Sequence, residues 1–539
     1  MKIEVHKSVK IEIICIIFIS IVLSLNLMRW LEIRNYHQTI LRVRSRREES
    51  LKNMEKVMDG IKTMDTFQTK IDHEHLLTLR DLQKSIKISD VSASYILHAY
   101  MEKALEATKK FNCITDFLPE CQTRLSELQD EPKGPLYGIP ISIKENINCK
   151  GHDSTCGLRK FINKPIDEDC VIVQVLKIQG AIPFVKTNVP QTLFSYECSN
   201  PIYGQTINPL NPKRTPGGSS GGEAALIAAG GSILGIGTDV GGSIRLPAAF
   251  CGICGFKPTA NRLSKKGLSV NSTGQRTVES SVGPLARDVD SLAYCMKALL
   301  CEDMFELDPT VPPLPFNDML ISFTPPKMFY AMNEVIFQGL LADHGASFLE
   351  SLQGDIIDPH LRTQVSTYAM PGVMKKLLCF FLKPFSPRVV AGIKATGGIG
   401  SVKELWKHHI AAMAYRDEYV NAWKRQNIEV LLCPSLGPAF NIGYAGELSV
   451  ASSYMVIFNL LNFPAGVVPV THVTEEDEKE LMNYTGFLND IWDKTFKKAV
   501  AGGVDLPLAV QCVALPWQDE LCLCFMKEVE RLVNLKKIT

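Results

Sequence analysis

A glycine- and serine-rich window constrains this chain more than any other stretch. Residues 216–252 read PGGSSGGEAALIAAGGSILGIGTDVGGSIRLPAAFCG, and twelve of the chain's 37 glycines lie between positions 217 and 255. Adjacent glycines leave the backbone bare, which suits loops whose N–H groups must approach a ligand closely. Between the two glycine clusters we expect an alanine-rich helix, because Ser220 and Glu223 have the S-x-x-E spacing of a capping box.

Known glycine-rich motifs fit this window poorly. It contains no G-x-x-x-x-G-K-[ST] phosphate loop, and the glycines at 235, 237 and 241 are spaced too widely for G-x-G-x-x-G. A G-x-S-x-G nucleophile motif matches twice, around Ser219 and around Ser220. That motif needs a hydrophobic strand before the serine, whereas the loop NPLNPKRTPGG is rich in proline. The window therefore disfavours nucleotide binding and gives only weak support for this motif.

The second glycine cluster, DVGGS, has the features that acyl transfer from an amide or ester requires. Such chemistry needs a nucleophile, a base and N–H donors directed at the developing oxyanion, and one donor contributes roughly 3 to 4 kcal/mol. Bare backbone that ends in Ser243 provides donors and a nucleophile together.

A lysine is the candidate base, because no histidine lies near the window and Ser–Lys enzymes use lysine in that role. Lys144 ends the apolar strand expected at YGIPISIK, where a charged amine is poorly placed. Lowering the pKa of a lysine from about 10.4 to near 7 costs roughly 4 to 5 kcal/mol. A lysine whose amine reaches solvent is the simpler structural alternative, and the residues alone leave both open.

The window resembles the amidase signature, and other segments resemble the membrane-bound fatty-acid amide hydrolases within that family. The resemblance extends over nearly all residues from about 136 to 530; outside the window it is carried by GHDSTCGL, TNVPQTLFSYECSNPIYGQTINP, LCEDMFELDPTVPPLPF, NFPAGVVPVT and LAVQCVALPWQDELCL. It implies an α/β fold with a large twisted mixed β-sheet surrounded by helices. It also implies hydrolysis of fatty-acid primary amides and N-acylethanolamines through a Ser-Ser-Lys triad, with no cofactor and no metal.

The resemblance assigns roles to individual residues. Ser243 matches the nucleophile, Ser219 the bridging serine and Lys144 the general base. An uncharged Lys144 would take a proton from Ser219, which takes one from Ser243. The other implied positions are the oxyanion-hole N–H groups of Val240, Gly241, Gly242 and Ser243, a supporting Ser220, structural roles for Asp239 and Arg245, and acyl-channel positions at Phe194 and Tyr196.

Residues 1–31 are predicted to form a transmembrane helix that anchors the chain. Residues 13–28 carry no charge, and the apolar run from 11 to 31 is about long enough to cross a bilayer. No small-residue cleavage site is present, and Arg29 and Trp30 follow at once, which favours a retained anchor over a signal peptide. The heavier basic flank lies downstream, so we expect a single-pass protein with a cytosolic catalytic domain. The terminal KKIT resembles a retrieval signal to the endoplasmic reticulum.

The hydrophobic pattern divides the chain after residue 31 into two parts. Residues 32–110 are charged and helically periodic, which predicts a helical membrane-proximal segment. Residues 111–539 alternate strands such as AIPFVKTN with helices, which predicts one catalytic domain. Within it, residues 370–396 carry apolar residues broken by cations and prolines. A buried helix followed by a loop is one interpretation, and the resemblance implies a membrane-binding cap.

Charge and cysteine content limit the partners. The chain has 58 basic and 57 acidic residues, so no overall field attracts a polyanion, and nucleic acid is not expected. Its 16 cysteines are scattered, as in proteins with reduced thiols. The C-x-x-C pair of Cys251 and Cys254 has no further ligands nearby in the sequence for a zinc site. The expected partners are a lipid amide and the bilayer, and the resemblance suggests a homodimer.

One departure from the family pattern raises an alternative. A strand and a helix of the family are absent between about residues 322 and 328. Losing a strand leaves buried backbone groups unpaired at about 1 to 3 kcal/mol each, against a total stability of about 5 to 15 kcal/mol. The alternative to a hydrolase is therefore a shortened, inactive amidase-like membrane protein that binds lipid or a partner. A soluble amidase of small polar amides is a third possibility.

Overall fold

A mixed sheet of nine strands forms the centre of the described molecule, in the order β1-β3-β2-β6-β8-β7-β10-β11-β9. The computed structural model describes residues 2–64, 78–87, 91–128, 134–270, 274–275, 277–312, 326–384, 386–426, 428–448, 451–486 and 488–538, without the side chains of 2–19, 32, 62–64 and 535–538. The strands are β1 (Ile114–Phe117), β2 (Pro140–Lys144), β3 (Ile182–Thr187), β6 (Leu234–Asp239), β7 (Cys254–Lys257), β8 (Ser281–Ala286), β9 (Val430–Pro434), β10 (Ala465–His472) and β11 (Pro507–Ala514), with β4 (Ser199–Asn200) and β5 (Gly204–Gln205) in a separate pair.

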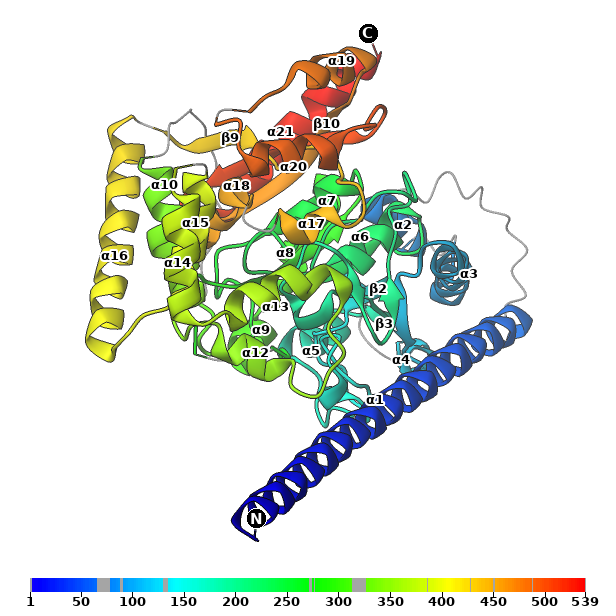
Figure 1. Ribbon diagram of the computed structural model, residues 1–539. Coiled ribbons are helices and arrows are strands. Elements are labelled where there is room, and N and C mark those ends of the chain that lie inside the picture. Colours follow the sequence, from blue (N-terminus) through cyan, green and yellow to red (C-terminus); the bar gives the residue numbers. More distant parts are fainter. Residues whose placement is uncertain are drawn as a thin grey trace.

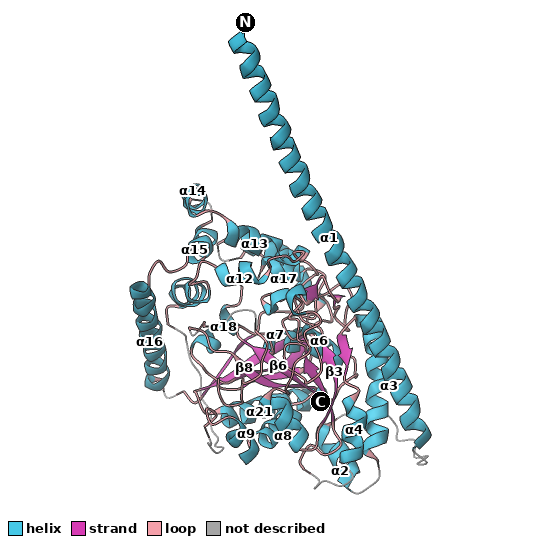
Figure 2. Ribbon diagram, turned by 90° about the horizontal axis from the view of Figure 1, so that it is seen from below, coloured by secondary structure: helices cyan, strands magenta, loops and turns pink. Residues whose placement is uncertain are grey.

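Helices cover both faces of this sheet (Figure 1). Those in the first half of the chain are α1 (Lys2–Met64), α2 (Leu79–Lys87), α3 (Ala93–Phe111), α4 (Glu120–Glu127), α5 (Val171–Ile178), α6 (Gly221–Ala228), α7 (Arg245–Phe250), α8 (Val289–Leu299) and α9 (Glu302–Leu307), with short turns η2 (Arg159–Phe161) and η3 (Gln191–Leu193). Those in the second half are α10 (Met328–Tyr330), the π-helix η4 (Ala331–Phe337), α11 (Gln338–Leu340), α12 (Ala346–Ser351), η5 (Pro359–Leu361), α13 (Arg362–Ala369), α14 (Gly372–Leu382), α15 (Pro387–Ala395), α16 (Val402–Arg425), α17 (Tyr444–Glu447), α18 (Ser453–Leu460), α19 (Glu475–Asn483), α20 (Ile491–Val500) and α21 (Asp519–Ile538). In Figure 2, α6, α7 and α18 lie on one side of the sheet and α8 and α21 on the other. The predicted large mixed sheet surrounded by helices is confirmed.

Three neighbouring strands place the site. β3, β2 and β6 are parallel to one another, and the other neighbours in the sheet are antiparallel. Each parallel strand is an apolar run that is almost completely buried, as expected for strands covered on both faces. Because parallel strands end at the same edge of a sheet, Thr187, Lys144 and Asp239 lie at one edge.

Helix α1 has two parts that differ in burial. Its second part packs on the body through residues at helical spacing, including Tyr36, Ile40 and Val43, which are at most 7% exposed. Its first part extends away from the body in both views (Figures 1 and 2). Of the predicted anchor, the side chains of residues 1–19 lie outside the described residues. Among the helices that the structure describes, none is long and apolar enough to cross a lipid bilayer.

The segment predicted as a cap forms two helices, α14 and α15, joined by a short connection. Large apolar side chains on α14 face solvent, with exposed fractions of 80% for Val373 and 75% for Phe380. The interpretation as a buried helix is therefore wrong, because its apolar residues are largely uncovered. Residues 322–325 of the expected gap lie outside the described residues, and Met328 begins α10.

Candidate active site

Lys144 and Ser219 are in direct contact at the edge of the sheet. The Lys144 Nζ lies 2.7 Å from the Ser219 Oγ, and Lys144 has no exposed surface. A lysine whose amine reaches solvent is therefore excluded. Ser219 follows a cis peptide bond from Gly218 and lies just before α6, so the first glycine cluster brings its hydroxyl to the end of β2.

Thr238 provides two hydrogen-bond acceptors for the Lys144 amine. The amine lies 2.8 Å from the Thr238 Oγ1 and 3.2 Å from the Thr238 carbonyl oxygen. The Thr238 hydroxyl itself donates to Asn146 Oδ1, so both oxygens of Thr238 accept from the amine. A neutral amine has two hydrogens and one lone pair, and both hydrogens are used here. With three hydrogens the charged amine donates to Ser219 as well, whereas the neutral amine keeps its lone pair for the Ser219 proton.

Burial favours the neutral form of the Lys144 amine over the charged form. Burial, opposed in part by the charge of Asp239, lowers the pKa of Lys144 to about 7. A substantial fraction of the protein therefore carries an uncharged amine near neutral pH. Such an amine can accept a proton, which is the property required of a general base.

The second glycine cluster forms a tight loop after β6 that carries Ser243. Gly242 has φ +113° and a Cβ there would lie 2.8 Å from the Met455 Cβ, so this position requires glycine. The Ser220 N–H donates to the Ser243 carbonyl oxygen at 3.0 Å, which fixes the two serine-bearing loops against each other. The loop that carries Ser243 therefore lies against the loop of Ser219, whose hydroxyl contacts Lys144.

The four N–H groups predicted for an oxyanion hole are not equivalent. The Gly242 N–H donates to Asp239 Oδ1 at 2.8 Å and is therefore occupied. Within the described residues, the N–H groups of Val240, Gly241 and Ser243 donate no hydrogen bond. The loop therefore offers three N–H donors, and the fourth stabilises the loop itself.

A buried ion pair holds this loop. Asp239 and Arg245 have no exposed surface, and Arg245 Nη2 lies 3.0 Å from Asp239 Oδ1. Burial raises the pKa of Asp239, but the Arg245 charge and hydrogen bonds outweigh it and hold that pKa well below its usual range. Arg245 also donates to Asn459 Oδ1 and Gln511 Oε1 at 2.6 Å each, so the loop is tied to α18 and β11. The predicted structural roles of Asp239 and Arg245 have this physical basis.

Replacing Arg245 with methionine is expected to destabilise the fold by about 3 to 5 kcal/mol, because it leaves the Asp239 carboxylate buried without its cation. Urea unfolding measures this difference. The double variant Arg245→Met with Asp239→Asn is expected to recover part of the loss, since no charge then remains uncompensated. A single variant that unfolds within about 1 kcal/mol of the wild type would contradict this account.

The predicted capping box at α6 is wrong. Ser220 occupies the N-cap position, yet its side chain accepts no capping hydrogen bond and its Oγ has no partner. Glu223 turns away from the helix end and contacts Ser142 and Thr187 on the neighbouring strands. Packing against the sheet therefore outweighs the local capping preference.

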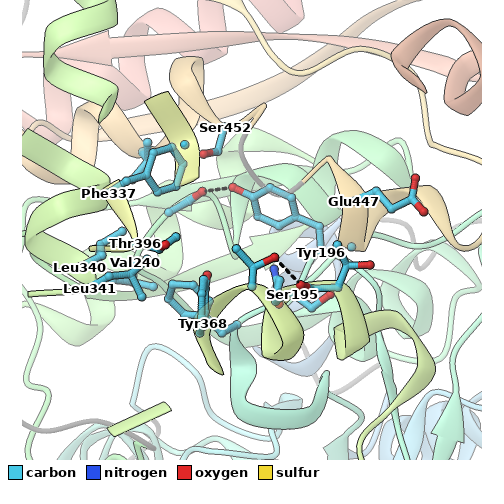
Figure 3. Close-up of a pocket in the computed structure, with 18 of the residues that line it drawn as sticks. Ser195, Tyr196, Val240, Phe337, Leu340, Leu341, Tyr368, Thr396, Glu447 and Ser452 are labelled. Carbon is cyan, nitrogen blue, oxygen red and sulfur yellow. Dashed lines mark hydrogen bonds between the residues drawn. The ribbon is translucent and has the colours of Figure 1, made fainter. Parts of the chain in front are cut away.

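Ser243 lies in the wall of an apolar cavity of about 290 Å³. Figure 3 shows this cavity with Tyr196, Val240 and Tyr368 among its labelled wall residues. Phe194 and Tyr196, the predicted channel residues, lie in its wall, and the Tyr196 hydroxyl donates to the Gly241 carbonyl oxygen. The remaining wall comes from Leu193, Ser195, Val240, Gly241, Phe337, Leu340, Leu341, Thr363, Gln364, Thr367, Tyr368, Val389, Gly392, Ile393, Thr396, Gly446, Glu447, Ser452, Val456 and Trp492.

Sequence reasoning missed most of that wall. Phe337, Tyr368, Ile393 and Trp492 come from four separate helices that carry no motif, and apolar residues at helical spacing give no signal for a cavity. Thr238 was also missed; it precedes Asp239 at the end of β6. Its position beside the glycine cluster was the available signal.

Comparisons with known proteins show the family to which the chain belongs. The amidase family model matches residues 95–320 and 319–523. A fatty-acid amide hydrolase 1 of Sus scrofa is 44% identical over 94% of this chain and 94% of its own length. A vitamin D3 hydroxylase-associated protein of Gallus gallus is 44% identical over 74% of this chain and 95% of its own. A solved structure of a fatty acid amide hydrolase has a TM-score of 0.74 at 23% identity and covers 93% of this chain and 96% of that one, which shows a shared fold.

The alternative of a shortened, inactive protein is not favoured by these findings. The two matched segments meet at residues 319–320, close to the expected gap, yet the alignment with the Sus scrofa protein covers 94% of both chains. The described residues still form a sheet of nine strands around the candidate site.

Proposed function

Because the chain belongs to the amidase family and is a hydrolase of amide C–N bonds, we propose that it cleaves fatty-acid amides, including primary amides and N-acylethanolamines, to a fatty acid and an amine. One observation carries the proposal: a buried Lys144 amine lies 2.7 Å from the Ser219 hydroxyl, in a site whose second serine, Ser243, faces an apolar cavity.

The proposed reaction begins with attack of the Ser243 Oγ on the amide carbonyl carbon. The Ser243 proton passes to Ser219, whose own proton passes to the lone pair of Lys144. The free N–H groups of Val240, Gly241 and Ser243 stabilise the oxyanion. The C–N bond then breaks as the proton returns through Ser219 to the leaving nitrogen. Water hydrolyses the resulting ester on Ser243 by the same relay.

The cavity supports a lipid substrate. Its walls are mainly apolar, with Phe194, Leu340, Ile393 and Trp492 among them, so a hydrocarbon chain can lie there without leaving polar groups unpaired. Burial of each methylene group contributes about 0.8 kcal/mol. A long acyl chain therefore binds more strongly than a short one.

Hydrolysis of oleamide and acetamide by the purified protein tests the substrate class. We expect kcat/KM for oleamide to exceed that for acetamide by at least about 100-fold, because most of the apolar contact is available only to the long chain. Equal or better hydrolysis of acetamide would favour the soluble amidase of small polar amides instead.

The exposed apolar surfaces support membrane attachment. The free part of α1 and helix α14 both project from the upper side of the molecule in Figure 2. A bilayer on that side would cover α14 and the exposed apolar residues of α1, which are Ile21, Val22, Leu23, Leu25, Leu27, Met28, Trp30 and Leu31. The proposal therefore includes a single-pass anchor, a cytosolic catalytic domain and residence in the endoplasmic reticulum, and the homodimer stays a prediction.

Replacing Phe380 and Phe381 with serine is expected to lower kcat/KM by at least about 100-fold for oleamide presented in lipid vesicles. These side chains are 75% and 62% exposed, and each contributes roughly 1.5 to 3 kcal/mol when buried in an apolar phase. Hydrolysis of a short water-soluble amide should not change. Met482→Ser, on α19 and 69% exposed, is the matched control. An equal loss on both substrates would argue against a membrane-facing cap.

A further inference from the structure

Glu223 is a fully buried carboxyl group beside the candidate base, and the proposed reaction does not use it. It lies in the first turn of α6, and its carboxyl reaches the sheet between β2 and β3. Oε1 accepts from the Thr187 hydroxyl at 2.8 Å, and Oε2 lies 2.6 Å from the Ser142 Oγ. A Cβ at position 235 would overlap Oε2, so Gly235 of β6 makes room for the carboxyl.

The hydrogen bonds beyond Glu223 form a short chain that requires one more proton than the hydroxyl groups hold. Ser142 Oγ lies 3.0 Å from Ser232 Oγ, and Ser232 Oγ lies 2.9 Å from the Leu234 carbonyl oxygen. With the contact between Glu223 and Ser142, three oxygen–oxygen contacts each need a proton. Two hydroxyl groups provide two protons, because each carries one hydrogen.

The third proton must come from the carboxyl group. All members of this chain are buried, with Ser232 at 1% exposure and the others at none. The consistent arrangement is therefore Glu223 donating to Ser142, Ser142 to Ser232, and Ser232 to the Leu234 carbonyl oxygen. An ionised Glu223 would leave one short contact between two oxygens without a hydrogen, and such a buried unmade hydrogen bond is unfavourable.

We propose that Glu223 is a neutral carboxylic acid in the resting protein, and that it is a positioning residue that joins α6 to β2 and adds no negative charge of its own beside the Lys144 amine. The joined elements carry Ser219 and Lys144 at their ends. A carboxylate at this place would favour the ammonium form of Lys144, which has no lone pair for the Ser219 proton. This consequence for catalysis rests on the proposed function, whereas the charge of Glu223 does not.

The electrostatic surroundings agree with a neutral acid. Burial raises the pKa of Glu223 to about 8, and the hydrogen bonds of Ser142 and Thr187 and the charge of Lys144 oppose it only in part. The titratable group that acts on it is Lys144 from β2, and Glu223 in turn acts on the thiol of Cys113, whose own pKa burial raises to about 12. On β3, the Lys186 amine donates instead to the Asp153 carbonyl oxygen and the Ser154 hydroxyl.

Infrared difference spectroscopy of the full chain tests the charge directly. The wild-type minus Glu223→Gln spectrum at pH 7 should contain the carbonyl stretch of a protonated carboxylic acid, and this band should vanish when the pH is raised well above 8, the pKa of this group. Glu145→Gln is the matched control, because buried Glu145 accepts from the backbone N–H groups of Thr155 and Cys156 and its replacement should not remove that band. Carboxylate bands alone in the difference spectrum at pH 7 would overturn the proposal, whether or not the protein hydrolyses amides.

The pH dependence of hydrolysis tests the effect on the base. Glutamine reproduces the shape and the neutrality of the acid, so Glu223→Gln should keep kcat/KM within about threefold and leave the acidic limb of its pH profile in place. Glu223→Ala, which loses the link to β2, should lower kcat by at least about tenfold. A shift of the acidic limb by about one pH unit to lower pH in Glu223→Gln would show that a charge had been removed, and would overturn the proposal.

Discussion

Replacing Ser243 with alanine is expected to abolish amide hydrolysis, with kcat lower by on the order of 10^5-fold or more. The Ser243 Oγ is the atom that attacks the carbonyl carbon in the proposed reaction, and the variant has no oxygen at this position to form the acyl ester. Oleamide hydrolysis measures the loss. Covalent labelling by a fluorophosphonate probe should disappear with it, because the probe reacts with an activated serine.

A second serine in the same cavity provides the control. Ser452 is buried and lies in the cavity wall, but it makes no contact with Lys144 or Ser219 among the described hydrogen bonds. Ser452→Ala should therefore keep labelling and most activity. Labelling that persists in Ser243→Ala and vanishes in Ser452→Ala would reverse the assignment of the nucleophile.

The parts of the fold and site that sequence predicts are those with a local signal. Lys144 was a candidate because it ends an apolar strand, and the loop of Ser243 was expected from its paired glycines. Both features depend on neighbours within a few residues. The large mixed sheet followed from the alternation of strands and helices and from the family resemblance.

The parts that sequence could not predict depend on contacts between distant segments. Glu223 had the spacing of a helix cap, yet Ser142 lies 81 positions earlier and competes successfully for its carboxyl. The sequence does not distinguish the Gly242 N–H from the other three N–H groups predicted for the oxyanion hole, but in the structure this N–H donates to the Asp239 carboxylate. In the first case a strand far away in the sequence changed the role of Glu223. In the second, Asp239 lies only three residues from Gly242, but it is held by Arg245, which is itself bound by Asn459 and Gln511 from distant segments.

Replacing Lys144 with methionine is expected to lower kcat/KM by roughly 10^2- to 10^4-fold, because the relay then has no acceptor for the Ser219 proton. In the wild type, kcat/KM should rise with pH through about 7, where Lys144 loses its proton. The variant should lack this rise. A wild-type profile that is flat between pH 6 and 8 would contradict an uncharged lysine as the base.

The same substitution is expected to make the protein more stable at neutral pH. The pKa of Lys144 is about 7 in the folded state and 10.5 for an ordinary lysine, so between these values the unfolded chain binds the extra proton. This penalty on the wild type is fully present below about pH 7, diminishes as pH rises, and is absent above about 10.5. It amounts to roughly 4 to 5 kcal/mol, from which the lost hydrogen bonds to Thr238 subtract about 1 to 3 kcal/mol.

Thermal unfolding between pH 6 and pH 10 measures this gain, which should shrink as the pH rises. Lys257 offers a matched control, because burial also lowers its pKa to about 7 while its amine donates to the Pro258 carbonyl oxygen and not to a serine. Lys257→Met should therefore share the stability effect and retain hydrolysis. If Lys144→Met loses both stability and activity at pH 7, the buried amine stabilises the fold instead of destabilising it. That outcome would contradict a Lys144 that is held uncharged by burial.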